Sequence, residues 1–169
     1  DALWNTGAND GKTYTYNNII TSKFYELERS NNIGKICSRG NYCTDTVSRT
    51  TTWTGKVGLM YPSDYGYATS GGSITDREKC LNTVLDGWNI YTDCYNSDWL
   101  YNSSTSQWTI SPNAYASYAY YAFFVNSLGR VVHSYVAYRF GVRPVVYLTS
   151  NVKISSGSGS ESDPFELSL

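Results

Sequence analysis

The sequence predicts a single α+β domain in which two short helices precede a series of short β-strands. Apolar residues recur at helical spacing in two segments of the first half of the chain, which indicates amphipathic helices. From residue 107 onward, short apolar runs separated by turn residues indicate β-strands. No internal repeat is evident, and 169 residues suffice to bury one core, so we expect one domain over residues 1–169.

The first helix is expected within residues 17–28, where Ile20, Phe24 and Leu27 lie on one helical face. The following segment, residues 34–54, is rich in Ser, Thr, Asn and Gly. Such residues favour turns over regular structure, so this segment is predicted to be a loop held by a disulfide.

The second helix is expected to begin at Thr75 or Asp76, either of which is a good N-cap, and to end at Gly87. It brings four apolar side chains together, namely Cys80, Leu81, Val84 and Leu85. Before this helix, residues 55–61 alternate weakly and then meet Pro62, which predicts a strand that runs into a turn.

The second half of the chain is predicted to be mainly β. Residues 107–110 form one short strand, and residues 122–125 and 130–133 form a hairpin around the turn sequence Asn-Ser-Leu-Gly. Residues 143–148 end in an almost continuous apolar run, which is typical of a strand buried on both faces.

The C-terminal part is predicted to contain one more strand and a polar turn. Residues 151–154 are expected to pair with an earlier strand. Residues 157–163 form the turn, which precedes a last short apolar piece with Phe165 and Leu167.

The four cysteines are predicted to form two local disulfides, Cys37 with Cys43 and Cys80 with Cys94, although four cysteines allow three connectivities. Disulfides indicate an oxidising environment. The alternative is four unpaired buried thiols in a cytosolic protein. A zinc site fits poorly, because the single histidine, His133, lies far from the cysteines, and no metal or cofactor is expected.

The chain starts at Asp1 without a signal peptide and contains no apolar run long enough to span a membrane. We therefore expect a mature or excised ectodomain that is extracellular or displayed on a cell surface. Any membrane attachment would then depend on an anchor outside this chain.

Charge and aromatic content limit the classes of function. The net charge is −1 with scattered lysines, which argues against a nucleic-acid partner. The chain holds 17 Tyr, 5 Trp and 5 Phe but one His and one Met. Tyrosine provides rigid amphipathic contact area, so this composition is more typical of a binding surface than of an enzyme.

Residues 113–140 have an unusual composition and are the candidate binding segment. Six Tyr and five Ala lie in this segment, and Lys, Glu, Gln, Trp and Met are absent from it, whereas about three such residues are expected by proportion. An aromatic core hairpin is the alternative interpretation. Against it, Tyr118, Tyr120 and Tyr121 fall on both faces of any strand, and four polar or aromatic residues would be difficult to bury, namely His133, Ser134, Tyr135 and Arg139.

Two motifs flank this segment, Trp108-Thr-Ile-Ser-Pro112 before it and Gly141-Val-Arg-Pro-Val-Val-Tyr-Leu148 after it. Together with the segment, they resemble the C-terminal region of diversity-generating retroelement variable proteins, which have a C-type lectin fold. The stretches Trp53-Thr-Gly-Lys-Val-Gly-Leu-Met-Tyr-Pro62 and Gly-Ser-Gly-Ser-Glu-Ser-Asp-Pro-Phe are also similar to bacterial surface proteins of that general kind. The resemblance implies two short helices packed on small antiparallel sheets, with long loops.

The resemblance also implies a mechanism for the unusual composition. In that family a reverse transcriptase copies a template with errors at adenines, and Asn codons are the preferred targets. Randomising the first two positions of such a codon never gives Lys, Glu, Gln, Trp or Met. These are the five residue types absent from residues 113–140.

By this resemblance, residues 113–140 carry the variable, solvent-facing side chains, between fixed scaffold residues. The variable positions are Tyr115, Ser117, Tyr118, Tyr121, Phe123, Arg130, His133, Ser134, Tyr135, Ala137 and Arg139. The scaffold positions are Trp108, Ile110, Pro112, Gly141, Val142, Arg143 and Pro144. Val125 and Val131 are expected in the core. Arg143 is expected either to bond loop carbonyls or to be an ordinary exposed arginine.

Catalysis is disfavoured, because the only candidate base, His133, lies in the segment expected to vary. Glu26 and Glu28 point to different faces of a helix, and Glu161 and Asp163 lie in a flexible tail. A formylglycine-generating type of enzyme shares the lectin-like fold, but all four cysteines precede the candidate segment and are expected to be structural.

Calcium-dependent sugar binding lacks its usual motifs in this sequence. Some of the oxygen ligands for a calcium ion would come from Asp93, Asn96 and Asp98, but a solvated loop is the preferred interpretation of this segment. Asn102-Ser-Ser104 matches a glycosylation sequon, which matters only in a eukaryotic secretory host. The sequence thus predicts a non-enzymatic domain that binds a protein or a glycan, and the alternative is a conventional adhesin or lectin with a fixed aromatic site.

Overall fold

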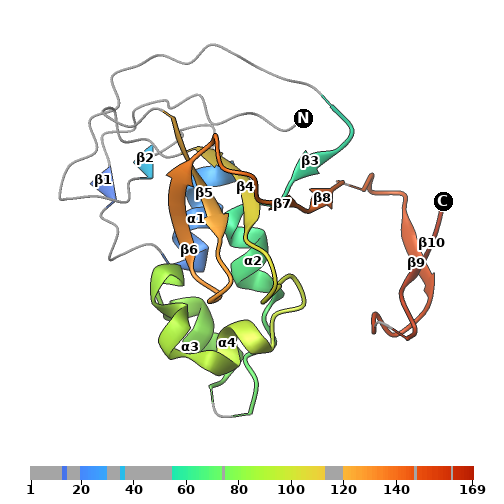
Figure 1. Ribbon diagram of the computed structural model, residues 1–169. Helices are drawn as coiled ribbons and strands as arrows, with labels where there is room; N and C mark the ends of the chain where they lie inside the picture. Colours follow the sequence, from blue (N-terminus) through green and yellow to red (C-terminus); the bar gives the residue numbers. More distant parts are fainter. Residues whose placement is uncertain are drawn as a thin grey trace.

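The computed structural model describes residues 13–14, 20–29, 35–36, 55–73, 75–112, 120–146, 148–160 and 162–169, and all structural statements below concern these residues. The architecture is α+β, as predicted. Short helices and a four-stranded sheet form the main body, and a C-terminal β-hairpin stands apart from it (Figure 1).

The four-stranded sheet contains β4 (Gln107–Pro112), β5 (Tyr121–Val125), β6 (Val131–Tyr135) and β7 (Gly141–Val142), in the order β6-β5-β4-β7. The predicted hairpin of β5 and β6 is confirmed, with Tyr121 opposite Tyr135 and Val125 opposite Val131. Strand β4 pairs antiparallel with β5 and parallel with the two-residue strand β7, so β5 lies between β6 and β4.

The turn of this hairpin depends on one glycine and one asparagine. Gly129 has a φ of 73°, and a Cβ at this position would lie 2.4 Å from the side chain of Tyr95. Glycine is therefore required by both the backbone conformation and the close approach of α4. The backbone N–H of Asn126 donates to the carbonyl of Arg130, which closes the turn.

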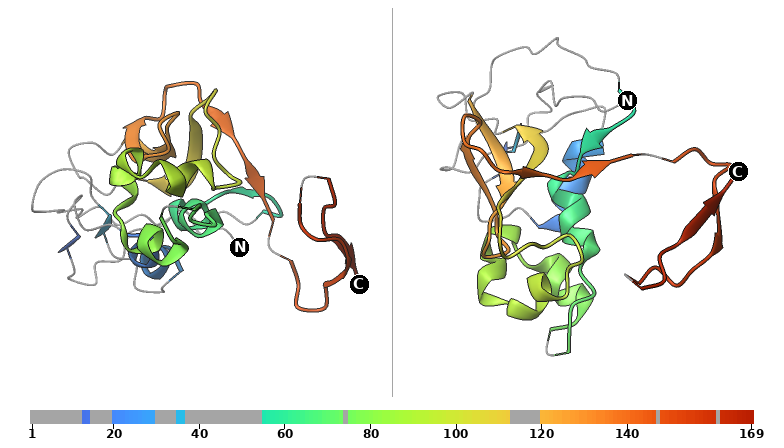
Figure 2. Two further views of the ribbon diagram at one scale, coloured as in Figure 1. Left: turned by 90° about the horizontal axis from the view of Figure 1, so that it is seen from below. Right: turned by 45° about the vertical axis from the view of Figure 1, so that its right-hand side comes forward.

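Helices α1 (Thr21–Arg29) and α2 (Pro62–Ala68) lie on one face of the sheet (Figure 2). Helix α1 overlaps the region predicted to be helical and ends one residue beyond it, but α2 begins where a turn was predicted. Pro62 occupies the first helical turn, where its missing N–H costs nothing, so the same proline that suggested a turn starts a helix. Gly66 lets the two helices approach closely, because a Cβ there would lie 2.3 Å from the hydroxyl oxygen of Thr21.

The second predicted helix is divided into two helical segments. Asp76 is its N-cap, as expected, and accepts a hydrogen bond of 2.6 Å from the backbone N–H of Lys79. However, α3 (Arg77–Asn82) ends at Asn82, because Thr83 has an extended backbone with ψ of 139°. Gly87 does not end a helix but lies inside the 3-10 helix η2 (Leu85–Ile90).

The short helix α4 (Thr92–Asn96) was not predicted, and the disulfide between Cys80 and Cys94 links it to α3. This disulfide agrees with the sequence prediction, and both cysteines are completely buried. Cys37 and Cys43 lie outside the described residues. In the first part of the chain, β1 (Thr13–Tyr14) pairs with β2 (Lys35–Ile36), so the predicted loop over residues 34–54 begins with a two-residue strand.

The hydrophobic core lies between the sheet and the helices. Its largest fully buried side chains include Trp88 and Tyr65, whose rings are 5.3 Å apart, together with Met60 and Leu85. Phe24 of α1 contacts Phe123 of β5 edge to face, with ring centroids 5.5 Å apart. Val125 and Val131 are 1% and 3% exposed, so both belong to the core, as predicted.

The predicted strand at residues 143–148 is wrong in length and in burial. Among the described residues of this range, the one strand is β8 (Pro144–Val145), and it pairs with β3 (Gly58–Leu59) outside the four-stranded sheet. Val146 and Leu148 are more than half exposed. The apolar run therefore does not form a strand buried on both faces, since the chain is leaving the body at this point (Figure 1).

The C-terminal hairpin contains β9 (Lys153–Ser156) and β10 (Glu166–Ser168). The polar turn between them is confirmed, and Asp163 accepts a hydrogen bond of 2.8 Å from the backbone N–H of Ser158. The predicted pairing is wrong, because β9 pairs with the following strand β10 and not with an earlier strand.

None of the helices among the described residues has the length and apolar character needed to cross a lipid bilayer.

Candidate functional site

A continuous set of aromatic rings covers one end of the sheet. Tyr120 and Tyr135 stack with centroids 4.9 Å apart and an interplanar angle of 8°. Tyr121 meets both of these rings edge to face, at 5.0 Å and 4.6 Å. Hydrogen bonds from Tyr121 and Tyr120 lower the pKa of the Tyr135 phenol, because they favour its ionised form. The three tyrosines therefore hold one another in fixed positions.

The rings continue from these tyrosines along the face of the sheet opposite the core. Tyr138 lies between Tyr135, at 6.2 Å, and Phe140, at 6.0 Å. Phe140 packs on Trp108 and Phe124, with centroids 4.7 Å and 4.5 Å apart. In addition, the indole N–H of Trp108 donates to the carbonyl of Tyr138 at 3.3 Å. The exposed ring of Tyr138 is thus connected through Phe140 to the buried ring of Phe124.

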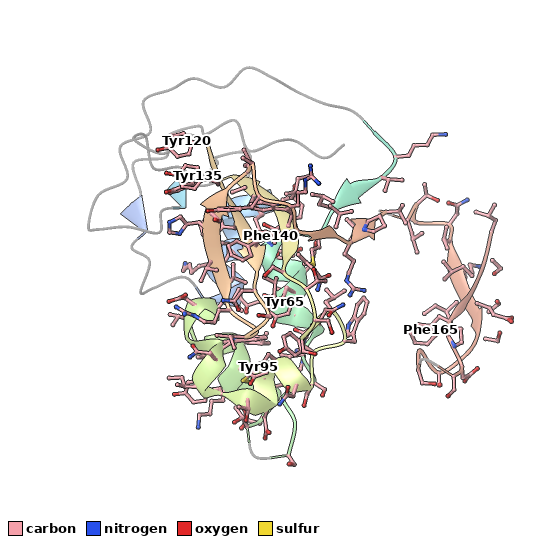
Figure 3. The ribbon with its side chains drawn as sticks, in the orientation of Figure 1. Tyr65, Tyr95, Tyr120, Tyr135, Phe140 and Phe165 are labelled. Carbon is pink, nitrogen blue, oxygen red and sulfur yellow. A yellow bond between two sulfur atoms is a disulfide. The ribbon has the colours of Figure 1, made fainter. Side chains whose placement is uncertain are left out.

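We call this set the tyrosine surface, which consists of Tyr120, Tyr121, Tyr135, Tyr138 and Phe140. Figure 3 shows Tyr120 and Tyr135 together at one end of the hairpin, whereas Tyr65 and Tyr95 lie toward α3 and α4, and Phe165 lies on the separate C-terminal hairpin. Tyr120 and Tyr135 are each 44% exposed, and Tyr138 is 56% exposed. The neighbouring residues Val136, Ala137 and Arg139 are also exposed.

Strand register explains why the same hairpin has a buried end and an exposed end. Tyr121, Phe123 and Val125 share one face of β5 because side chains alternate along a strand. Phe123 lies over Phe24 of α1 and is 1% exposed, but Tyr121 at the end of the strand is half-buried. The expectation that Phe123 faces solvent as a variable residue is therefore wrong.

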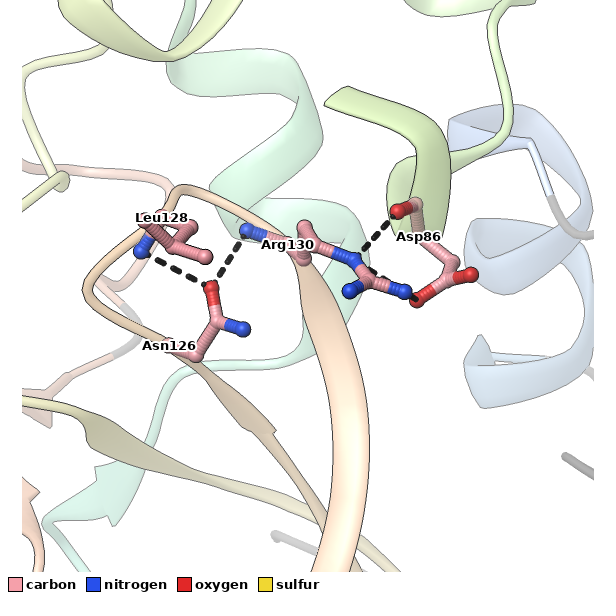
Figure 4. A network of polar contacts seen from close by, with 4 residues as sticks. All are labelled: Asp86, Asn126, Leu128 and Arg130. Carbon is pink, nitrogen blue, oxygen red and sulfur yellow. Dashed lines mark hydrogen bonds and ion pairs between the residues drawn. The ribbon is translucent and has the colours of Figure 1, made fainter. Parts of the chain in front are cut away.

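Arg130 was predicted to be a variable ligand-binding residue, but it connects the hairpin to η2 (Figure 4). Its Nε donates to the backbone carbonyl of Asp86 at 2.7 Å, and its Nη2 lies 2.6 Å from Oδ1 of the same residue. The side-chain oxygen of Asn126 accepts hydrogen bonds from the backbone N–H groups of Leu128 and Arg130, each at 3.0 Å. Arg130 and Asn126 thus fix the turn against the helical part of the body.

The remaining predicted variable positions fall into three groups. Tyr135, Ala137 and Arg139 are exposed, as expected for a binding surface. Tyr121, His133 and Ser134 are half-buried beside them, and the His133 ring is 5.0 Å from the Tyr121 ring. Tyr115, Ser117 and Tyr118 lie outside the described residues.

Tyr120, Tyr138 and Phe140 belong to the tyrosine surface but were not among the predicted site residues. All three are aromatic and lie inside residues 113–140, which is the signal that indicated them. The positions expected to face solvent did not include them, and Tyr138 and Phe140 follow the end of β6.

The predicted scaffold residues have mixed environments. Ile110 is buried, Trp108 and Gly141 are half-buried, and Val142 and Pro144 are exposed. Pro112 is the last residue of β4.

Among the described residues, Arg143 bonds a glutamine side chain and not a loop carbonyl. Its Nε donates to the side-chain oxygen of Gln107 at 3.0 Å, and the Gln107 amide in turn donates to the carbonyl of Leu100 at 3.2 Å. Because Gln107 is only 4% exposed, this chain of bonds fixes the segment after β7 to the start of β4.

The residues considered for calcium do not form a solvated loop, which corrects that expectation. Asp93 and Asn96 lie in α4, and Asp93 accepts a hydrogen bond of 3.1 Å from the backbone N–H of Thr75. Asp98 is 5% exposed, and burial raises its pKa to about 8. In the part of the chain that the structure describes, no three metal-binding side chains of His, Cys, Asp or Glu come together.

The other polar residues singled out in the sequence have structural contacts. Both the hydroxyl and the backbone N–H of Ser63 donate to the carboxylate of Glu28, which joins α1 to the start of α2. The side-chain oxygen of Asn102 in the sequon accepts a hydrogen bond of 2.8 Å from the backbone N–H of Ser104. Side chains of Glu26 and Glu161 lie outside the described residues.

No protein-family model, curated protein or solved structure matches the chain.

Proposed function

We propose that this protein is a non-enzymatic ligand-binding domain and that the tyrosine surface is its binding site. The observation that supports this proposal is the exposure of several aromatic rings that are already fixed by contacts with one another. Exposed Tyr120, Tyr135 and Tyr138 offer large amphipathic contact areas. Since the rings of Tyr120 and Tyr135 stack on each other and the Trp108 indole binds the backbone carbonyl of Tyr138, little side-chain entropy is lost on binding.

We further propose a C-type lectin-like fold and an extracellular or surface-displayed location, with a protein or a glycan as the ligand. The arrangement of α1 and α2 on one face of a small sheet with long connections supports the fold, and the Cys80–Cys94 disulfide supports the oxidising location. A surface protein of this kind takes part in adhesion.

Diversification by a retroelement is part of the proposal, and the packing narrows the positions it can use. Changes at Phe123 would remove a core contact with Phe24, and changes at Arg130 would break the bonds to Asp86. Variable positions should therefore lie before residue 122 and after residue 132.

The coding DNA tests the diversification. We expect a near-copy of the sequence for residues 113–140, differing mainly at template adenines, beside a reverse transcriptase gene. Its differences should spare the codons of Phe123 and Arg130. If the DNA contains no such copy, the site is the fixed aromatic site of a conventional adhesin or lectin.

A peptide selection tests the binding site itself. A random peptide library displayed on phage is selected against the whole chain, and the selected clones are then measured against a double variant, Tyr135→Ser with Tyr138→Ser. We expect clones that lose about tenfold or more in affinity for the double variant, because exposed aromatic anchors dominate binding energy.

Tyr25→Ser is the matched control, since Tyr25 is 46% exposed but lies on α1, where its ring packs on Tyr67 of α2. The selected clones should bind this variant as tightly as the unchanged chain. If no clone distinguishes the double variant from this control, the tyrosine surface is not the binding site.

A further inference from the structure

The part of the chain that builds the tyrosine surface lacks carboxylate side chains. No Asp or Glu occurs from Trp99 to Ser160, although the chain has 14 acidic residues among 169 and about five would be expected over this length by proportion. The same stretch contains three arginines, a lysine and the only histidine. A protein of net charge −1 thus builds its aromatic surface from a segment that carries only positive charge.

The arginines of this stretch differ in their contacts. Arg130 is paired with Asp86, and Arg143 bonds Gln107. Arg139 is exposed, and it lies between Tyr138 and Phe140 in the sequence. An exposed, planar guanidinium is suited to a carboxylate, which it can bind through two parallel N–H groups.

We infer that the tyrosine surface binds an acidic segment of another protein, in which carboxylates alternate with apolar side chains. This inference rests on the proposed function and specifies its ligand. Arg139 binds a carboxylate, and the rings of Tyr135 and Tyr138 with the exposed Val136 contact the apolar side chains. The absence of carboxylates in this stretch removes the repulsion that an acidic partner would otherwise meet.

The surface is less suited to two other ligands, a glycan and a single-stranded nucleic acid. Sugar hydroxyl groups are usually held by amide and carboxylate side chains, and Asn, Gln, Asp and Glu are all absent from residues 133–140. A single-stranded nucleic acid requires a continuous track of cations along its phosphates. Residues 131–142 provide only Arg139 as an arginine or lysine.

The test compares two labelled synthetic peptides by fluorescence anisotropy, one of alternating Glu and Phe and one of alternating Gln and Phe. We expect the Glu peptide to bind about tenfold more tightly at low ionic strength, with the difference shrinking as salt is added. Arg139→Gln should weaken the Glu peptide about fivefold and leave the Gln peptide unchanged. Lys153→Gln, which removes an exposed charge on β9, is the control and should change neither.

The possible results separate this inference from the proposed function. Equal binding of both peptides, with loss in the variant with Tyr135→Ser and Tyr138→Ser, would overturn the acidic ligand and leave the binding site in place. Arg139-dependent binding of oligogalacturonate or oligothymidylate, without binding of the Glu peptide, would assign the surface to a glycan or a nucleic acid. Residues 161–169 of the chain itself carry acidic and apolar side chains. If the chain self-associates in sedimentation and a peptide of these residues dissociates it, the ligand is the C-terminal segment of a second copy, and the assignment to another protein is overturned.

Discussion

Replacing Arg130 by Ala tests whether this residue belongs to the scaffold or to the binding surface. The change removes a hydrogen bond to the backbone carbonyl of Asp86 and a charged pair with its carboxylate, at 2.7 Å and 2.6 Å. Charge-assisted hydrogen bonds contribute roughly 1.5–3 kcal/mol when shielded from water. The Arg130 side chain is 32% exposed and that of Asp86 is 18% exposed, so solvent screening lowers the expected loss to about 1–2 kcal/mol.

The assay is urea unfolding followed by tryptophan fluorescence, because Trp88 lies at the centre of the core. Arg139→Ala is the matched control and should change the free energy of unfolding by less than about 0.5 kcal/mol, since Arg139 is exposed. The double variant with Asp86→Ala and Arg130→Ala should cost less than the sum of the single changes, because the two residues contact each other. Equal stability of Arg130→Ala and Arg139→Ala would refute the reasoning and return Arg130 to the variable positions.

Three further changes probe the core, a buried carboxyl group and the disulfide. Phe123→Ala should lower the free energy of unfolding by about 3–5 kcal/mol in the same assay, whereas a solvent-facing residue would cost almost nothing. Burial raises the pKa of Asp98 to about 8, and an unfolded aspartate titrates near pH 3.9, so the native state holds the extra proton between these values. Stability should therefore fall as the pH rises from about 4 through 8, and Asp98→Asn should remove this dependence; a flat profile in the unchanged chain would contradict it. Replacing Cys80 and Cys94 together by Ser should cost about 3 kcal/mol, because the residues are 14 apart in the sequence, and an unchanged melting temperature would exclude a stabilising role.

The elements that sequence reasoning located are those set by local chemistry. Asp76 caps a helix because its side chain reaches a backbone N–H three residues later, and such a contact depends only on nearby residues. The hairpin of β5 and β6 follows from two apolar runs around a turn with Asn126 and Gly129. Both features can be inferred without knowing what packs against them.

The elements that were missed depend on tertiary packing. Pro62 is compatible with a turn and with the first turn of a helix, and contacts between α2, α1 and the core select the helix. Val146 and Leu148 are apolar but exposed, because the chain leaves the two-stranded sheet of β3 and β8 after Val145. An apolar run indicates only that burial is favourable, and it cannot indicate whether a partner is present.

Burial also changes what the composition of residues 113–140 implies. Ala122, Phe123, Phe124 and Val125 are all less than 9% exposed, so charged and amide side chains would be excluded from these positions by packing alone. The absence of Lys, Glu and Gln is therefore informative mainly at positions that face solvent. Within the described residues, these are Tyr120, the turn residues Ser127 and Leu128, and the stretch from Tyr135 to Arg139. At these positions packing imposes no such limit, so they are the positions at which the proposed diversification and the proposed acidic ligand are to be tested.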